Sequence, residues 1–134
     1  MLIGAPKIDM NEKERALEAR YALDSPAGVR KILRDYHALL ERQYKGDYDA
    51  VVILNDLQRA VDQAQLTRRQ RQAVYYVYVR DLTQSDAGKA IGVAQHSLAG
   101  LLARAEAEIA AVFEAWAWQD EGYAIHYDNY GEAE

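Results

Sequence analysis

The feature that most constrains this chain is a series of helix start and stop signals packed into residues 66–104. Thr67 and Thr83 are each followed three residues later by Gln or Asp, the spacing of a threonine N-cap with its partner in the first helical turn. Gly92 is suited to the positive φ of a tight turn. The pattern therefore predicts three helices in this region, at about 67–79, at 83–91 and from 95 onward.

The second and third of these helices have the pattern of a helix-turn-helix. Such a unit needs a small residue where the helices cross, which is Gly88, and a glycine in the turn, which is Gly92. If they cross in this way, the edge from Gln95 to Gly100 faces outward. An edge packed into the interior, or a region built of strands, would contradict this interpretation. The apolar residues that supply the inner face are Ile91, Val93, Leu98 and Leu101.

Hydrophobic periodicity predicts helices in the rest of the chain as well. Helix-forming residues occupy 9–23, and apolar residues recur every three or four positions from 27 to 45. A third stripe covers 51–64, although its VVIL run would also suit a buried strand. The helix that begins near 95 keeps its apolar period to Trp118. We therefore expect an all-α fold, a small helical domain with a helix-turn-helix in its C-terminal part and a long last helix.

The chain divides on this basis into three segments. They are an N-terminal helical segment at 1–65, the helix-turn-helix with its extended third helix at 66–118, and an acidic, aromatic tail at 119–134. In the tail, Tyr123, Ile125 and Tyr127 alternate as in a strand, yet the acidity and the glycines fit a loose segment equally well. Such a tail is either solvated or folds over the basic motif as a competitor for phosphate.

Composition argues against several classes of protein. A chain of 134 residues with half of its positions apolar can bury one core. It contains no run of 18 apolar residues and its first residues do not match a secretion signal, so we expect it in the cytoplasm and not in a membrane. Without cysteine, and with His37, His96 and His126 far apart in sequence, no metal or other cofactor is expected. No spacing builds a nucleophile with its base, a paired acid cluster or a phosphate loop, so the chain is not expected to be an enzyme.

The formal net charge of −5 is distributed unevenly along the chain. Residues 66–104 carry six basic and two acidic side chains, a net charge of +4. Residues 105–134 carry eight acidic side chains and no Lys or Arg, while residues 1–65 are nearly balanced. Only the middle segment therefore favours phosphate, and the terminal segment would repel it.

The stretch LTRRQRQAVYYVYVRDLTQSDAGKAIGVAQHSLAGLLARAEAEI resembles region 4 of bacterial sigma factors, and more closely the short sigma-like regulators of phages and prophages. It covers a third of the chain, and the resemblance rests on LTRRQR, DLTQ, IGV and LLARA in the family's order and spacing. Weaker similarity extends upstream through DYDAVVILNDLQRAV, whereas nothing resembles sigma region 2, the promoter-melting module. The resemblance implies binding to double-stranded promoter DNA and modulation of bacterial RNA polymerase in a bacterial host cell, rather than independent initiation.

The helix-turn-helix interpretation supplies a set of candidate DNA-contacting residues. In the major groove, Gln95 can pair with an adenine edge, and His96 or Ser97 with a base or phosphate oxygen. The start of the preceding helix, at 83–85, can offer backbone and hydroxyl donors to phosphate. The complete set is Arg68, Arg69, Arg71, Thr83, Gln84, Ser85, Lys89, Gln95, His96, Ser97, Ala99, Gly100 and Arg104.

Departures from the family pattern bear on affinity. The family usually has Ser or Thr at the cap where this chain has Ala94, and often long polar or basic side chains where it has Ala99 and Gly100. Basic residues commonly follow the LLARA element, whereas this chain continues with Glu106 and Glu108. Each phosphate contact contributes about 0.9 to the slope of log K against log salt, so fewer contacts mean weaker binding. We therefore expect weak DNA binding by the isolated chain, strengthened by contact with RNA polymerase or by dimerisation.

Two other functions fit the same motif. The missing basic residues are also consistent with a protein-binding adaptor, such as an inhibitor or appropriator of host RNA polymerase. The small DNA-recognition subunit of a phage packaging enzyme often carries a helix-turn-helix as well, and it would form a ring of many copies.

Several side chains also have plain structural interpretations. His96 and the arginines at 68–71 are equally consistent with solvated surface residues. The tyrosines between 75 and 78 are expected at the core and its edge rather than as a stacking platform for bases. Trp116 and Trp118 are two residues apart on a helix and so cannot both face inward. One of them is expected at a contact between chains or against the tail.

Overall fold

The computed structural model describes residues 21–130, with side chains described as far as Gln119. The described part is helical throughout and contains no strand, which confirms the expected all-α class. The expected helix at 9–23 lies almost entirely outside the described residues. The elements are α2 (Pro26–Arg34), α3 (Tyr36–Tyr44), α4 (Tyr48–Ala64), α5 (Arg68–Val74), the π-helix η1 (Tyr75–Val79), α6 (Gln84–Ile91) and α7 (Gln95–Tyr130).

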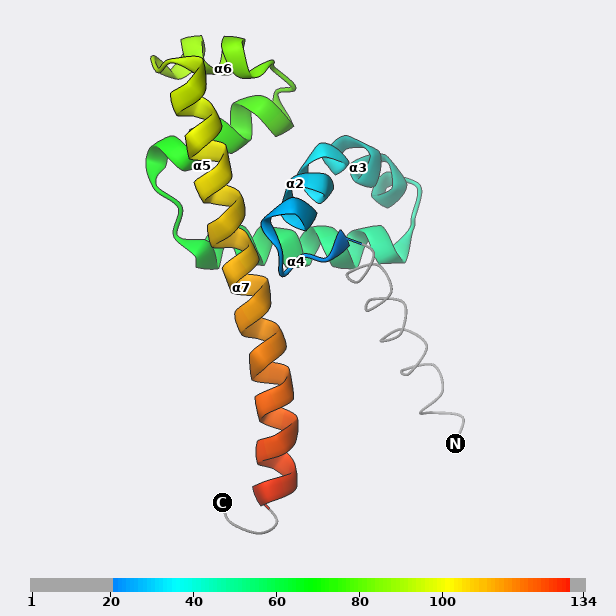
Figure 1. The fold of residues 1–134 in the computed structure, drawn as a ribbon. Helices are drawn as coiled ribbons and strands as arrows, with labels where there is room; N and C mark the ends of the chain where they lie inside the picture. The colour runs from blue at the N-terminus through cyan, green and yellow to red at the C-terminus, as the bar shows by residue number, and fades with distance from the viewer. Residues whose placement is uncertain (1–20, 131–134) are drawn as a thin grey trace.

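The long helix α7 is the central element against which most of the other helices pack (Figure 1). Its first turns pack against α5 and α6, and its middle packs against α2 and α4. The backbone of α7 continues as a helix to Tyr130, beyond the expected end at Trp118. The alternation of Tyr123, Ile125 and Tyr127 therefore does not form a strand. No helix within the described residues combines the length and the apolar character needed to cross a bilayer.

Helix α2 and helix α3 replace the single helix expected between 27 and 45. The Ser25 side chain caps α2 by accepting a 3.1 Å hydrogen bond from the backbone N–H of Gly28. The chain then bends at Asp35, whose φ of −89° and ψ of 7° leave the helical range. Tyr21 donates a 2.8 Å hydrogen bond to the Asp35 carboxylate at this bend. Since an apolar stripe with helical period is compatible with one helix or two, the sequence pattern did not reveal the break.

Helix α4 confirms the helical interpretation of the VVIL run. Asp47 caps it by accepting a 3.0 Å hydrogen bond from the backbone N–H of Asp49. Ile53, Leu54 and Leu57 are buried on one side, at the spacing of a helix with one apolar face. The helix ends at Gln65, which takes the left-handed conformation with φ 52°.

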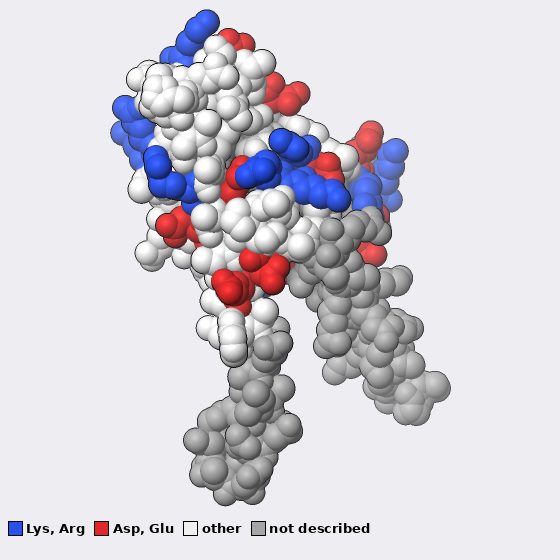
Figure 2. All heavy atoms as spheres, in the orientation of Figure 1, with Lys and Arg blue, Asp and Glu red and all other residues white. Residues whose placement is uncertain are grey.

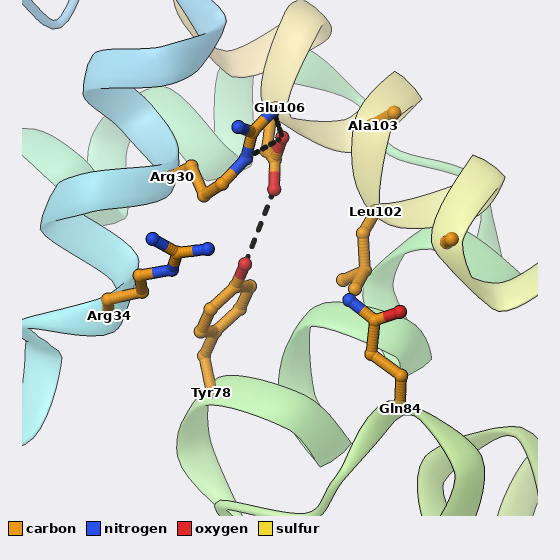
Figure 3. A pocket seen from close by; sticks show the side chains of 8 residues that line it. Arg30, Arg34, Tyr78, Gln84, Leu102, Ala103 and Glu106 are labelled. Atoms are coloured by element: carbon orange, nitrogen blue, oxygen red, sulfur yellow. Dashed lines mark hydrogen bonds and ion pairs between the residues drawn. The ribbon is translucent and has the colours of Figure 1, made fainter.

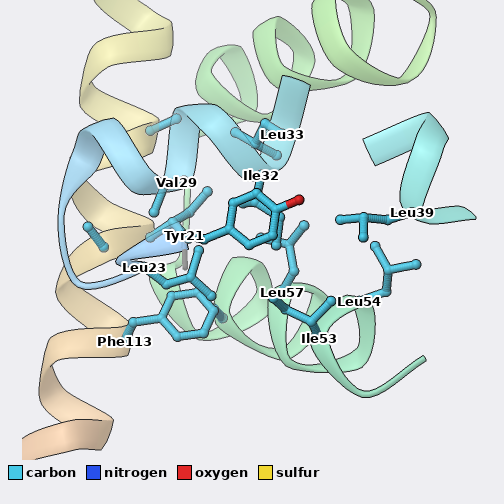
Figure 4. Close-up of a cluster of buried hydrophobic side chains, with 14 of the residues drawn as sticks. Tyr21, Leu23, Val29, Ile32, Leu33, Leu39, Ile53, Leu54, Leu57 and Phe113 are labelled. Atoms are coloured by element: carbon cyan, nitrogen blue, oxygen red, sulfur yellow. The ribbon is translucent and has the colours of Figure 1, made fainter. Parts of the chain in front are cut away.

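The main hydrophobic cluster lies between α2, α3, α4 and the middle of α7 (Figure 4). Its fully buried valine, leucine and isoleucine side chains each contribute about 1.5–3 kcal/mol relative to exposure. On the α7 side, Ile109 and Phe113 close the cluster against the N-terminal helices. The largest fully buried aliphatic side chains in it are Val29, Ile32, Leu39, Ile53 and Ile109.

A second, smaller cluster holds the helix-turn-helix together. Its buried members are Ala73, Ala87, Leu98 and Leu102, from α5, α6 and α7. Helix α7 therefore supplies side chains to both clusters, and a single rigid element joins the helix-turn-helix to the N-terminal helices. Tyr78 packs at the edge of both clusters.

The segment 75–79 departs from the expected single helix at 67–79. The α-helix ends at Val74, and a π-helix follows in which the Arg80 N–H donates to the Tyr75 carbonyl at 2.9 Å, five residues back. The wider turn changes the directions in which the tyrosines point. Tyr76 and Tyr78 are half-buried and Tyr75 is exposed, which agrees with their expected place at the core and its edge.

The two tryptophans of α7, Trp116 and Trp118, lie on different sides of the helix, as expected for residues two positions apart. Trp116 is half-buried, and its indole N–H donates a 2.9 Å hydrogen bond to Gln63. The Arg59 guanidinium lies over its ring, 4.6 Å from the centroid. Trp118 is 68% exposed on the other side of the helix. The expected contact of one tryptophan with a second chain or with the tail stays a prediction.

Candidate nucleic-acid interface

The helix-turn-helix geometry depends on two glycines, as the sequence predicts. A Cβ on Gly88 would lie 2.8 Å from the Val93 carbonyl oxygen, so only glycine fits this crossing without a shift. Gly92 has φ 77°, the left-handed conformation that ends α6 and turns the chain into α7. The Val93 N–H donates a 2.9 Å hydrogen bond back to the Gly88 carbonyl and closes the turn.

The two threonine caps are present as well. Thr67 forms a full capping box with Gln70, with hydrogen bonds of 3.1 Å and 3.0 Å. The Thr83 hydroxyl accepts a 3.0 Å hydrogen bond from the Asp86 N–H at the start of α6. The N–H groups of the first residues of α6 remain available for an anion, because a helix N-terminus leaves such donors unpaired. Exposed side chains surround them at Gln84 and Ser85.

The first turns of α7 present the predicted edge, residues Gln95–Gly100 and from here on the recognition edge, to solvent. Leu98 and Leu102 are buried on the inner side. On the outer side, Gln95, His96 and Ala99 are exposed, and Ser97 and Gly100 are partly exposed. The edge is therefore not packed into the interior, and the condition that would have contradicted the helix-turn-helix interpretation is not met.

Gly100 and Arg104 form one surface on this edge. The Arg104 guanidinium lies 3.6 Å from the position that a Cβ on Gly100 would occupy. The Arg104 side chain thus folds back along the helix to within van der Waals distance of this position. This arrangement places the guanidinium of Arg104 beside Gly100.

The other predicted basic residues lie in several different surroundings. Arg69 donates a 3.3 Å hydrogen bond to the Ile91 carbonyl at the C-terminal end of α6, so it supports the turn. Arg71 lines a different hollow, an apolar groove of about 480 Å³ between α3, α4 and η1. Arg68 is exposed on the first turn of α5, and Lys89 is exposed near the end of α6.

A buried polar cluster missed by sequence reasoning lies beside the recognition edge (Figure 3). Glu106 of α7 is only 2% exposed. Its Oε1 accepts from Nε and Nη2 of Arg30 on α2, both at 3.1 Å, and its Oε2 accepts a 3.3 Å hydrogen bond from the Tyr78 hydroxyl. Both carboxylate oxygens are therefore paired.

The cluster perturbs the ionisation of its members. The hydrogen bond and the negative charge of Glu106 raise the pKa of the Arg30 guanidinium. Burial and the adjacent Glu106 charge raise the pKa of Tyr78 to about 12. At neutral pH Arg30 is therefore a cationic guanidinium and Tyr78 a neutral phenol.

This cluster corrects one expectation about affinity. Glu106 was expected to lie where related proteins place a phosphate-binding base, and so to oppose DNA. Its carboxylate is instead buried and neutralised by Arg30, which lies 76 positions earlier in the chain. No local sequence signal could have indicated this pairing. Glu108 is exposed and does contribute uncompensated negative charge on α7.

The cluster forms one wall of a groove of about 280 Å³. Arg30 and Arg34 line it from α2, while Gln84 and Ala99 line it from the helix-turn-helix. Figure 2 shows the corresponding face, with basic side chains over α2 and along the edge of the helix-turn-helix. Uncharged side chains cover most of the surface between them, and acidic side chains gather farther along α7.

Comparison with known proteins does not assign the chain to a family: no family model, no curated protein and no solved structure matches it. The resemblance to sigma region 4 therefore rests on the motif residues of this sequence. What supports a function is the geometry of the interface itself.

Proposed function

We propose that the protein is a DNA-binding transcription regulator of the phage or prophage type, which acts at promoters together with bacterial RNA polymerase. One observation carries the proposal. The Gln95–Gly100 edge of α7 is open to solvent in a helix-turn-helix closed by Gly88 and Gly92, and Ala99 of that edge lines a groove together with Gln84 at the N-terminus of α6. This arrangement suits insertion of α7 into a major groove, with α6 against the flanking backbone.

Each part of the interface has a defined task in this proposal. Gln95 reads an adenine edge, and His96 or Ser97 contacts a neighbouring base or phosphate oxygen. The N-terminus of α6 at 83–85 binds phosphate through backbone N–H groups. Arg104 adds a charged contact to the backbone. Because Ala99 and Gly100 cannot reach the bases, specificity is limited and the isolated chain binds weakly.

Binding to a panel of host promoter fragments, with and without RNA polymerase, tests the proposal. The variant carrying Gln95→Ala, His96→Ala and Arg104→Ala is expected to lose protected positions in footprinting. Lys45→Ala, which removes an exposed charge at the turn between α3 and α4, serves as the control and should bind as the wild type does. Absence of binding by the wild type under both conditions, or equal binding by the triple variant, would contradict the proposal.

The protein-binding adaptor is a second candidate function. The observation in its favour is that exposed short side chains stand at Ala99 on the recognition edge and at Ala103 one turn farther along α7, where a base-reading helix would have longer ones. An adaptor would retain purified RNA polymerase in a pull-down even when Gln95, His96 and Arg104 are replaced by alanine. If the protein is a DNA-binding regulator, the same triple variant must lose protection of the promoter in footprinting. The pull-down and the footprinting together therefore distinguish the adaptor from the regulator.

A further inference from the structure

The groove between α2 and the helix-turn-helix contains an uncompensated positive charge. Arg30 and Arg34 are four residues apart on α2 and therefore lie on the same helix face. Figure 3 shows both guanidinium groups on the side of the groove that contains Tyr78 and Glu106. Glu106 neutralises Arg30. Arg34 forms no ion pair or hydrogen bond with any residue whose side chain the structure describes.

The surroundings of Arg34 contain few competing acids. Glu106 is already paired on both oxygens. Asp81 lines an adjoining hollow together with Arg34 and His37, but it forms no ion pair within the described part of the chain. One cation thus remains available at the mouth of the groove, with the half-exposed Arg30 guanidinium beside it.

The opposite wall of the groove belongs to the candidate DNA interface. Gln84, the first residue of α6, and Ala99, on the recognition edge, both line it. Ala99 and Ala103 have short side chains, so a bulky chain can approach α7 closely at this point. A DNA strand whose phosphates contact the N-terminus of α6 would therefore pass the mouth of this groove.

We infer that Arg34, flanked by Arg30, binds a backbone phosphate of the DNA whose major groove α7 enters. This inference rests on the proposed function and adds a contact from outside the motif. Arg30 is held in place by Glu106, whose other carboxylate oxygen accepts from Tyr78, and it acts chiefly as a fixed neighbouring cation. The contact is to the backbone, so it contributes affinity without sequence preference.

Salt-dependent DNA binding by the full chain tests the inference. Arg34→Gln is expected to reduce affinity by a similar factor for every duplex, and to lower the slope of log K against log salt by about 0.9. Between about 50 and 200 mM salt, the wild type should then lose about 3.5-fold more affinity than the variant. Lys31→Gln removes an equal charge from the same helix, at a side chain that lies over the Tyr21 ring. It should keep the wild-type slope.

Each outcome has a distinct meaning. An unchanged slope in Arg34→Gln, while Gln95→Ala weakens binding to the preferred sequence, would overturn the inference and leave the proposed function standing. Failure of the wild type to bind any duplex, with or without polymerase, would overturn both. Inorganic phosphate replaces chloride at equal ionic strength in a third arm. Extra displacement of DNA by phosphate that disappears in Arg34→Gln would show that the free anion competes with DNA for Arg34, and it would support the inference.

Discussion

Arg30 and Glu106 join α2 to α7 through two contacts of 3.1 Å, although 76 positions separate them in the sequence. Tyr78 of the π-helix completes the cluster by donating to the other carboxylate oxygen at 3.3 Å. Three segments distant in sequence thus meet at one carboxylate, at the place where the helix-turn-helix joins the N-terminal helices. The orientation of α2 relative to the recognition edge depends on this cluster.

Replacing Glu106 by alanine should lower the free energy of unfolding by about 1–3 kcal/mol, because Arg30 and Tyr78 lose their shared partner in a partly buried place. Gln58→Ala, which breaks the exposed hydrogen bond to Asp62, should change it by no more than about 0.5 kcal/mol. Chemical denaturation followed by circular dichroism measures both. Equal effects of the two substitutions would show that the cluster does not hold α2 against α7.

Gly88→Ala is expected to destabilise the helix-turn-helix by about 1–3 kcal/mol, since the added Cβ would lie 2.8 Å from the Val93 carbonyl oxygen. The same substitution should weaken DNA binding, because the two helices cannot cross at their native distance. Lys89→Ala, an exposed position on the same helix, is the stability control. Thermal unfolding of the two variants distinguishes a close crossing of α6 and α7 from a general loss of helix stability. A Gly88→Ala variant as stable as the wild type would contradict the close crossing.

The stability of the protein at alkaline pH should depend on the ionisation of Tyr78. Its pKa is raised to about 12 by burial and by the adjacent Glu106, so the folded state favours the neutral phenol. This contribution is fully present below about pH 10, the ordinary tyrosine pKa, and it is lost as pH rises toward 12. The melting temperature of the wild type should therefore fall across this window.

The matched control for this titration is an exposed tyrosine. Tyr78→Phe should show a shallower decrease of melting temperature between about pH 10 and 12, because the titrating phenol is gone. Tyr48→Phe, at a side chain that is 49% exposed, should behave as the wild type does. Parallel curves for wild type and Tyr78→Phe would mean that Tyr78 titrates alike in the folded and unfolded states.

The two threonine caps should separate stability from DNA binding. Thr67→Ala and Thr83→Ala each remove a capping acceptor and should each cost about 0.5–2 kcal/mol. Only Thr83 lies at the end of α6 that is proposed to contact phosphate. Thr83→Ala should therefore also reduce affinity in the direct binding assay, whereas Thr67→Ala should bind normally at temperatures where it is folded. The reverse order of affinities would argue against a phosphate site at the start of α6.

The sequence alone determined the features that depend on residues a few positions apart. The caps at Thr67 and Thr83, the left-handed Gly92 and the helical periods all act within one or two turns, so their signals are local. Because side-chain directions on a helix repeat with a known period, the outward position of the Gln95–Gly100 edge followed from the same information.

Tertiary structure decided the rest. The pairing of Arg30 with Glu106 joins distant segments. Asp35 at the break accepts a hydrogen bond from Tyr21, and Tyr78 of the π-helix packs against both hydrophobic clusters. An apolar stripe with helical period does not show whether the helix bends. The residues next to a glutamate in the sequence likewise do not show which distant residue will pair with it in the folded protein. The charge count by segment therefore grouped Glu106 with the acidic end, whereas in the folded chain it is buried and paired with Arg30 of α2.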